Sequence, residues 1–138
     1  MSAVSVLYVE DDEVDVFLMD RAWRGVRLVN PLHVVHDGQE AMDYLSGEGR
    51  FADRGVHPIP GLVLLDLKLP KIHGLQLLKW IREQPLTRTL RVIILSASNQ
   101  ERDMTDAEAL GITDYWVKSG EPGELPKMIA GLKGLLSL

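Results

Sequence analysis

The chain has 138 residues, 46% of them hydrophobic, and a formal net charge of −5, which suits one compact domain with a buried core and leaves no room for a second. The absence of cysteine excludes disulfides, thiol catalysis and Cys-ligated zinc, and the acidic balance argues against direct binding to DNA. No stretch approaches the roughly 20 apolar residues of a membrane span, so we expect a cytoplasmic protein that does not enter the membrane.

Short apolar runs bounded by acidic residues, Gly or Pro predict strands, and segments with apolar residues at helical spacing predict helices between them. The predicted strands lie within 3–9, 31–38, 62–67, 91–95 and 113–118. The predicted helices lie at 14–26, 39–45, 75–84, 100–110 and 124–136. Residues 46–61 are rich in Gly and Pro and show little periodicity, so we expect a long surface loop there.

Apolar stripes on the first and last helices define the faces that we expect to pack on the sheet. In the first helix the stripe comprises Val14, Phe17, Leu18 and Ala22. In the last helix it comprises Leu125, Ile129, Leu132 and Leu136. Together with Trp116 on the fifth strand, the last helix also suggests a surface for a partner or for self-association.

Strict alternation of strands and helices predicts an α/β fold with a parallel sheet and helices on both faces, because right-handed crossovers must pack back onto the sheet. The expected architecture is a flavodoxin-like (βα)5 doubly wound sheet with strand order 2-1-3-4-5. In such sheets, ligands bind at the carboxyl ends of the strands.

Polar side chains stand at the carboxyl ends of four of the five predicted strands. They are Glu10, Asp11 and Asp12 at the end of the first strand, Asp66 at the end of the third, Ser96 at the end of the fourth and Lys118 at the end of the fifth. Crowded carboxylates repel one another unless a cation neutralises them, and Mg²⁺ suits a site of carboxylates, backbone oxygen and water. A nearby hydroxyl and ammonium could bind the oxygens of a phosphoryl group delivered to one carboxylate. Taken singly, each acid is more simply a helix cap or a solvated turn residue, and only their joint placement favours a site.

Four segments resemble, in order and spacing, the receiver domain of two-component response regulators. They are "YVEDDE", "LVLLDLKLPKIHG", "ILSAS" and "DYWVK". The resemblance covers essentially the whole chain, and the loop at 46–61 accounts for a longer interval than usual between Asp11 and Asp66. It implies a single receiver domain over residues 1–138. Because residues 119–138 suffice for only one helix, we expect no effector domain.

The resemblance implies a role for each residue at the ends of the strands. Asp66 matches the phosphoacceptor, and the Mg²⁺ ligands would be Glu10, Asp11, Asp66 and the backbone carbonyl of Lys68. Asp12 falls one position beyond the acidic pair and is left as a spare acid or a helix cap. A protein of this kind is a switch that catalyses only its own phosphorylation and dephosphorylation.

The remaining matched residues concern the response to phosphorylation. Lys118 would bind the phosphoryl oxygens, and Ser96 would turn its hydroxyl inward to do the same. Tyr115 matches the aromatic switch that follows this movement, and Ala97 matches the small residue that leaves the phosphoryl group accessible. The output would be a change on the face formed by the fourth helix, the fifth strand and the fifth helix, through which a homodimer is also expected.

Two positions depart from the receiver pattern. Lys68 stands where a neutral or shorter polar side chain is usual, and its ammonium could pair with Glu10 or shield the phosphoryl group from water. Ser119 replaces a proline, so a cis peptide after Lys118 is not expected. Among single-domain receivers, the chain most resembles those encoded beside bacterial phytochromes, which implies a sensor histidine kinase that responds to light as the partner.

Two other functions compete with this interpretation. Haloacid dehalogenase-like phosphatases also use a strand-end Asp nucleophile, but their second Asp stands two residues later, where this chain has Lys68, and their acidic pair follows the nucleophile. A pseudo-receiver would keep the fold as a binding module without phosphorylation. Every residue of the receiver core is present here, which favours the phosphorylated switch.

Overall fold

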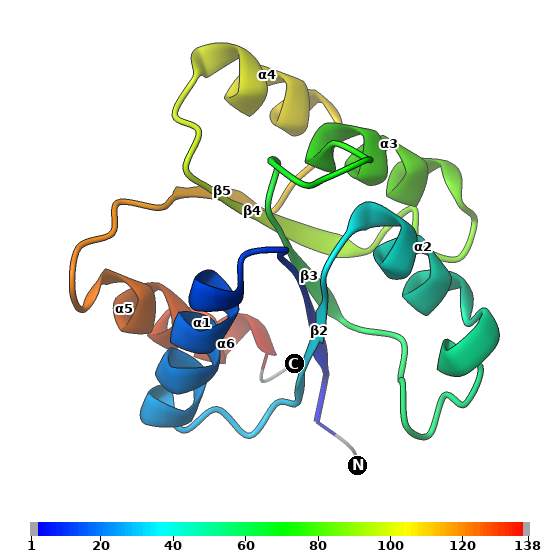
Figure 1. Ribbon diagram of the computed structural model, residues 1–138, viewed down its shortest axis with the longest axis horizontal. Helices are drawn as coiled ribbons and strands as arrows, with labels where there is room; N and C mark the ends of the chain where they lie inside the picture. Colours follow the sequence, from blue (N-terminus) through cyan, green and yellow to red (C-terminus); the bar gives the residue numbers. More distant parts are fainter. Residues whose placement is uncertain (1–2, 137–138) are drawn as a thin grey trace.

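The structure, a computed structural model, describes residues 3–136 and alternates strands with helices (Figure 1). In chain order the elements are β1 (Val6–Val9), α1 (Glu13–Val26), β2 (Leu32–Val35), α2 (Gly38–Ser46), the short 3₁₀ helix η1 (Gly49–Phe51), β3 (Leu62–Leu65), α3 (Gly74–Glu83), β4 (Arg91–Ser96), α4 (Glu101–Ala109), β5 (Asp114–Val117), α5 (Glu124–Ala130) and α6 (Lys133–Leu136). The predicted strands and the first four predicted helices are all present, with boundaries displaced by a few residues.

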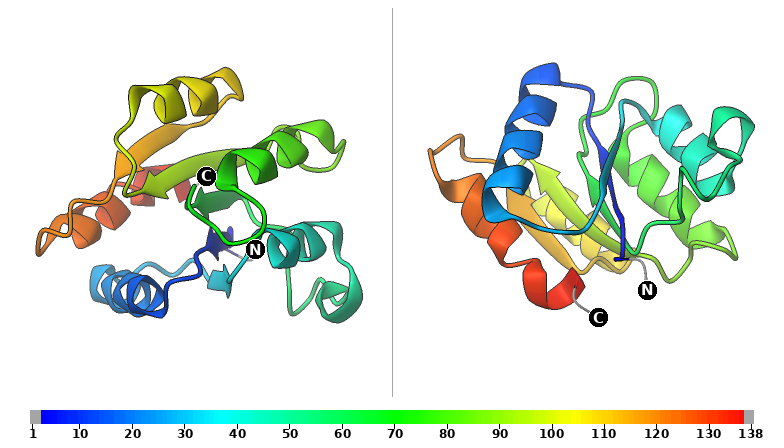
Figure 2. Two further views of the ribbon diagram at one scale, coloured as in Figure 1. Left: turned by 45° about the horizontal axis from the view of Figure 1, so that its top comes forward. Right: turned by 90° about the horizontal axis from the view of Figure 1, so that it is seen from below.

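The five strands form one sheet in the order β2-β1-β3-β4-β5, and every neighbouring pair is parallel. Helices α1, α5 and α6 cover one face of the sheet and α2, α3 and α4 cover the other (Figures 1 and 2). The predicted flavodoxin-like fold and strand order are therefore confirmed.

Alternating side chains of the central strands pack into two separate hydrophobic cores, one on each face of the sheet. In β1, Leu7 and Val9 join the core under α2, α3 and α4, whereas Val6 and Tyr8 join the core under α1, α5 and α6. All four residues of β1 and of β3 are buried. This two-sided burial explains why these strands appear in the sequence as continuous apolar runs.

The predicted packing face of α1 is wrong in most of its members. The helix buries Met19, Ala22 and Trp23, and the Trp23 indole N–H donates to the carbonyl of Asn30 at 2.8 Å. The remaining residues of the predicted stripe are exposed: Val14 by 65%, Phe17 by 62% and Leu18 by 44%. The helix carries two neighbouring apolar stripes, and helical spacing alone does not say which one meets the sheet.

The last predicted helix is divided into α5 and α6 around Gly131. Glycine lowers helix propensity, and the chain turns tightly there, with the Leu132 N–H donating to the carbonyl of Ile129 at 2.9 Å. Ile129, Leu132 and Leu136 are all buried in the core beneath α1, and Trp116 packs against the same core. This stripe is consequently internal, which corrects the expectation that it forms a partner surface.

The loop at 46–61 is more ordered than its composition predicts. Its 3₁₀ helix buries Phe51, whose ring contacts the rings of Tyr44 and His57 at centroid distances of 5.1 Å each. The Arg54 guanidinium donates to the carbonyls of Tyr44 and Leu45 at the end of α2. The insertion is thus a packed lobe against α2. Within residues 3–136, no helix combines the length and apolarity needed to cross a bilayer.

Candidate functional site

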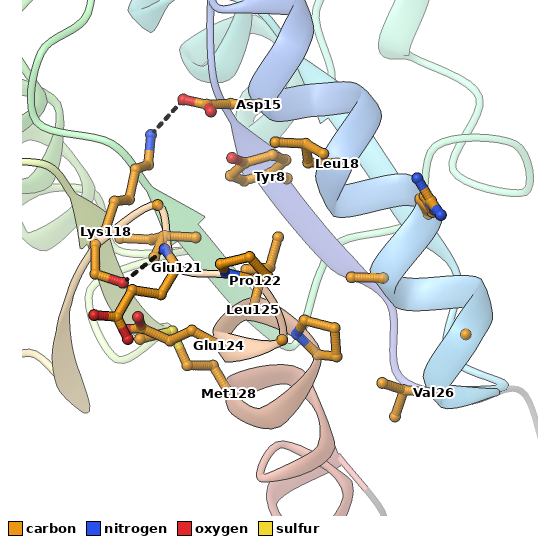
Figure 3. A pocket seen from close by; sticks show the side chains of 18 residues that line it. Tyr8, Asp15, Leu18, Val26, Lys118, Glu121, Pro122, Glu124, Leu125 and Met128 are labelled. Carbon is orange, nitrogen blue, oxygen red and sulfur yellow. Dashed lines mark hydrogen bonds and ion pairs between the residues drawn. The ribbon is translucent and has the colours of Figure 1, made fainter.

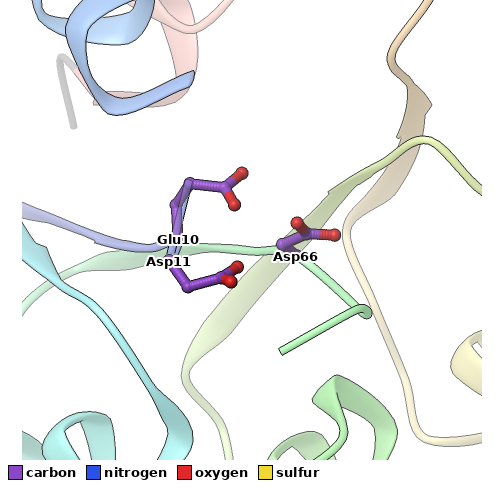
Figure 4. Close-up of side chains that lie close together, drawn as sticks. All are labelled: Glu10, Asp11 and Asp66. Carbon is purple, nitrogen blue, oxygen red and sulfur yellow. The ribbon is translucent and has the colours of Figure 1, made fainter. Parts of the chain in front are cut away.

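Three carboxylates converge at the carboxyl ends of β1 and β3. Because Val9 and Leu65 are partners in the parallel register, the residues that follow them, Glu10 and Asp66, leave the sheet side by side. Oxygens of Glu10, Asp11 and Asp66 all lie within 4.8 Å of one another (Figure 4). The structure therefore brings together the three acidic side chains that the sequence suggested as metal ligands.

Glu10 is the most deeply placed of these acids, with 1% of its surface exposed. Its Oε1 accepts a hydrogen bond from the Tyr8 hydroxyl at 3.2 Å. Burial, assisted by the neighbouring charge of Asp66, raises the pKa of Glu10 to about 7, and the hydrogen bond from Lys118 opposes this shift. Burial also raises the pKa of Tyr8 far above its usual value, so Tyr8 stays protonated and donates to Glu10.

Lys118 follows β5 and reaches across β4 and β3 to this cluster. Its Nζ lies 2.5 Å from Glu10 Oε1, 3.0 Å from Asp15 Oδ2 and 3.3 Å from Asp66 Oδ2. These hydrogen bonds and charges raise the pKa of Lys118, although burial alone would lower it. A permanently charged ammonium therefore stands beside the proposed acceptor carboxylate.

The remaining predicted site residues lie at the end of β4 and within the neighbouring β5. Ser96 is fully buried, and its Oγ accepts a hydrogen bond from the backbone N–H of Ser98 at 3.2 Å. The Tyr115 hydroxyl donates to the carbonyl of Ser98 at 2.8 Å, and Ala97 is exposed at the same edge. In the part of the chain that the structure describes, Ser96 makes no hydrogen bond to Asp66, so these residues form a second group beside the acidic cluster.

The loop after Asp66 is shaped by a close backbone approach at Gly74. A Cβ on Gly74 would lie 2.4 Å from the Asp66 carbonyl oxygen and 2.5 Å from the Leu67 Cα, which only glycine avoids. The backbone N–H of Lys68 donates to Asp66 Oδ1 at 3.2 Å. The Lys68 side chain is exposed, and among residues 3–136 it forms no ion pair, whereas Glu10 pairs with Lys118.

Sequence reasoning missed two residues of the first turn of α1 that shape this site. Asp12, left open as a spare acid or a cap, is the N-cap of α1 and accepts from the backbone N–H groups of Val14 and Asp15. Asp15, to which no role was assigned, contacts Lys118. An acid in the first turn of a helix is usually explained by the helix dipole, so nothing in the sequence singled out Asp15.

A cavity of about 730 Å³ lies between α1 and the segment from Lys118 to Met128. Figure 3 shows Tyr8, Asp15 and Leu18 on one side of it and Glu121, Pro122 and Leu125 on the other. The Asp15–Lys118 ion pair lies at one end of this cavity, and Lys118 also contacts Glu10 and Asp66 of the acidic cluster. The cavity is thus lined by Asp15 and Lys118 but by none of the three clustered acids.

The acidic cluster has the chemistry of a site for a small divalent cation. Three carboxylates offer oxygen ligands, the donor type that Mg²⁺ prefers. Burial and the neighbouring charge of Asp66 raise the pKa of Glu10 despite its pairing with Lys118, and a bound cation would oppose both effects. The residues present thus fit a metal ion held by Glu10, Asp11 and Asp66.

The sequence that forms this arrangement of a buried strand-end Asp, an acidic pair and a lysine matches a known protein family. The response regulator receiver domain family matches residues 6–130. The chain belongs to this family. As a receiver, it is 31% identical over 128 residues to the response regulator Rcp1 of Synechocystis sp., and the alignment covers 93% of this chain and 85% of Rcp1.

Solved structures of response regulators resemble this receiver over nearly its whole length. The phosphorylated cyanobacterial phytochrome response regulator RcpA superposes with a TM-score of 0.88 at 31% identity, covering 99% of this chain and 95% of RcpA. The bacteriophytochrome response regulator RtBRR gives a TM-score of 0.81 at 38% identity, covering 98% of this chain and 78% of RtBRR. The Mn²⁺-bound form of Rcp1 gives 0.84 at 30% identity, covering 96% and 94%. This receiver is therefore similar to two phytochrome response regulators, and the response regulator Rcp1, to which it is also similar, binds Mn²⁺.

Proposed function

We propose that this receiver is a stand-alone response regulator that accepts a phosphoryl group on Asp66 from a sensor histidine kinase. The observation that carries the proposal is the placement of Asp66, whose carboxylate lies within 4.8 Å of two further acids and 3.3 Å from the Lys118 ammonium. A carboxylate needs such surroundings, because it is a weak nucleophile and the phosphoryl donor is anionic. The alignment with the response regulator Rcp1, which covers 85% of that protein, supports the proposed role.

In the proposed reaction an oxygen of Asp66 attacks the phosphorus of a phosphohistidine. An O–P bond forms, the P–N bond breaks, and the histidine nitrogen leaves with the bonding electron pair. Lys118, 3.3 Å from Asp66, binds an oxygen of the transferred group. Glu10, Asp11, Asp66 and the Lys68 carbonyl would hold Mg²⁺, which would supply charge neutralisation for the phosphoryl oxygens.

The proposed switch converts this added charge into a change of surface. An aspartyl phosphate adds about two negative charges and three acceptor oxygens, which would draw the Ser96 hydroxyl away from the Ser98 N–H that it now accepts from. The Tyr115 side chain, whose hydroxyl donates to the carbonyl of Ser98, would follow the movement of Ser96. The affected face comprises α4, β5 and α5, and Ala97 would leave the phosphoryl group accessible.

A bacterial phytochrome is the kinase that we propose as the partner, because two similar structures are those of phytochrome response regulators. The exposed apolar residues Val14, Phe17 and Leu18 lie in the first half of α1, which begins two residues after Asp11, and would offer the kinase a contact while its phosphohistidine reaches Asp66. The homodimer through α4, β5 and α5 and the cytoplasmic location stay predictions.

The two competing functions receive less support. A haloacid dehalogenase-like phosphatase would need an acid-base catalyst two residues after Asp66, and the exposed Lys68 stands there. A pseudo-receiver has no need of a lysine held among three carboxylates by hydrogen bonds of 3.3 Å or less. Both alternatives predict that the protein acquires no stable phosphoryl adduct.

Intact-mass measurement after incubation with Mg²⁺ and acetyl phosphate tests the proposal, with a phosphorylated histidine kinase as a second donor. We expect one phosphoryl adduct in the wild type and none in Asp66→Asn or without the metal. An adduct that survives Asp66→Asn would contradict the assignment of the acceptor. If neither donor labels the wild type, the pseudo-receiver is the better description.

A further inference from the structure

The Lys118 ammonium has a carboxylate partner that stands outside the metal cluster. Of its three acidic partners, Glu10 and Asp66 belong to the cluster of possible metal ligands, whereas Asp15 does not. The Asp15 contact, at 3.0 Å, is shorter than the contact with Asp66, at 3.3 Å. Figure 3 shows the two side chains pointing toward one another across the end of the cavity beside α1.

Asp15 is held in place by the start of α1. Its backbone N–H donates to the carboxylate of the N-cap Asp12 at 3.2 Å, so the first turn of the helix fixes the position of its Cβ. Its side chain is 35% exposed, compared with 1% for Glu10. Lys118 is thus held between the buried end of β1 and a rigid helical turn nearer the surface.

The three carboxylates differ in how well they can bind Lys118 once a metal ion occupies the cluster. Oxygens of Glu10 and Asp66 that coordinate a cation are less available to an ammonium, and two cations that share a carboxylate repel each other. Asp15 has no such competitor. An ammonium carries three donors, so Lys118 can keep Asp15 on one of them and direct another toward Asp66.

We propose that Asp15 is a positioning residue that holds the Lys118 ammonium beside Asp66 when Glu10 is engaged with metal. This inference rests on the proposed function and assigns to it a residue outside the receiver motifs. The inference predicts an effect opposite in sign to simple electrostatics. A negative charge near an anion-binding site should by itself weaken anion binding, so neutralising Asp15 should strengthen anion binding if Asp15 acts directly. If Asp15 acts by holding Lys118, neutralising it should weaken anion binding.

The test is the affinity for fluoroberyllate, a phosphoryl analogue, measured by calorimetry with Mg²⁺ present. We expect Asp15→Asn to weaken binding about tenfold, the scale of one charge-assisted hydrogen bond. In a Lys118→Ala background the same substitution should change the affinity less than about twofold, because the group through which Asp15 acts is gone. Asp20→Asn is the matched control, since Asp20 lies on the same helix and pairs only with the exposed Arg24 among residues 3–136.

A second readout does not depend on phosphoryl chemistry. In ¹⁵N-labelled protein, ammonium protons held in hydrogen bonds exchange slowly enough to be observed. We expect a Lys118 ammonium signal in the Mg²⁺-loaded wild type and in Asp20→Asn, and its loss in Asp15→Asn. An unchanged signal, or fluoroberyllate binding to Asp15→Asn as tight as to the wild type, would overturn the assignment. Failure of the wild type to be phosphorylated would instead contradict the proposed function, and the ammonium signal would still decide the role of Asp15.

Discussion

The Lys118 ammonium lies 2.5 Å from Oε1 of Glu10, a carboxylate with 1% of its surface exposed. The two residues are far apart in the chain and meet because β5 and β1 end at the same edge of the sheet. A buried ion pair is costly to break, since the partner left behind keeps its desolvation penalty. This pair therefore links the stability of the domain to the site.

Removing the lysine should consequently destabilise the domain in a pH-dependent way. At pH 8 we expect Lys118→Ala to lower the free energy of unfolding by about 3 kcal/mol. Near pH 6 the loss should be smaller, because the pKa of Glu10 is already raised to about 7 and the unpaired carboxyl can become neutral. Urea unfolding at both pH values measures the difference. Lys79→Ala, at an exposed position of α3, should change the stability by less than about 0.5 kcal/mol at either pH.

The affinity for Mg²⁺ should fall as the pH is lowered. Metal binding requires Glu10 to be deprotonated, and its pKa in the metal-free protein is about 7, so protons compete with the cation below that value. We expect binding about tenfold weaker at pH 6 than at pH 8, measured by calorimetry. Glu10→Gln should bind the metal more weakly at both pH values and lose most of the pH dependence. A wild-type affinity that is flat over this range would show that Glu10 is not a ligand.

The loop that presents Asp66 should not tolerate a side chain at position 74. In Gly74→Ala the new methyl group would lie 2.4 Å from the Asp66 carbonyl oxygen, so the loop must move. We expect a loss of about 3 kcal/mol in unfolding free energy, as for an overpacked core site, and slower phosphorylation. Gly25→Ala in α1 is the control, because its Cβ meets no atom within 4 Å and alanine favours the helix. Equal stability of the two variants would contradict this account.

The exposed ammonium of Lys68 should slow the loss of the phosphoryl group. We expect the Lys68→Asn variant to dephosphorylate about two- to tenfold faster, because a shorter neutral side chain no longer shields the acceptor from water. That acceleration corresponds to at most about 1.4 kcal/mol. Decay of the intact-mass adduct after removal of the donor gives the rate. Lys71→Asn removes the same charge from the same loop, and Asn tolerates the positive φ of 67° found there. Equal decay rates in Lys68→Asn and Lys71→Asn would contradict this role for the Lys68 side chain.

The apolar patch on α1 should matter for the kinase and not for a small donor. Phe17 is 62% exposed, so replacing it with Ala should leave the fold and the acetyl phosphate reaction unchanged. Transfer from a phosphorylated bacteriophytochrome kinase should slow about tenfold, the usual cost of removing an aromatic interface anchor. Leu86→Ala, at an equally exposed position away from α1, serves as the control. Equal slowing with both donors would indicate damage to the site itself.

The alternation of strands and helices and the polar residues at the strand ends could be predicted from the sequence. These depend on local patterns: continuous apolar runs for β1 and β3, and polar side chains directly after them, where parallel strands must end at a common edge. The sequence could not show which apolar stripe of α1 is buried, because Met19 and Phe17 are both apolar, and it is the packing of the folded chain that places Met19 in a core with Trp23 and leaves Phe17 exposed. The contact between Asp15 and Lys118 also depends on the folded structure. An ion pair between a helical turn and a distant strand end requires distances that no local sequence pattern encodes.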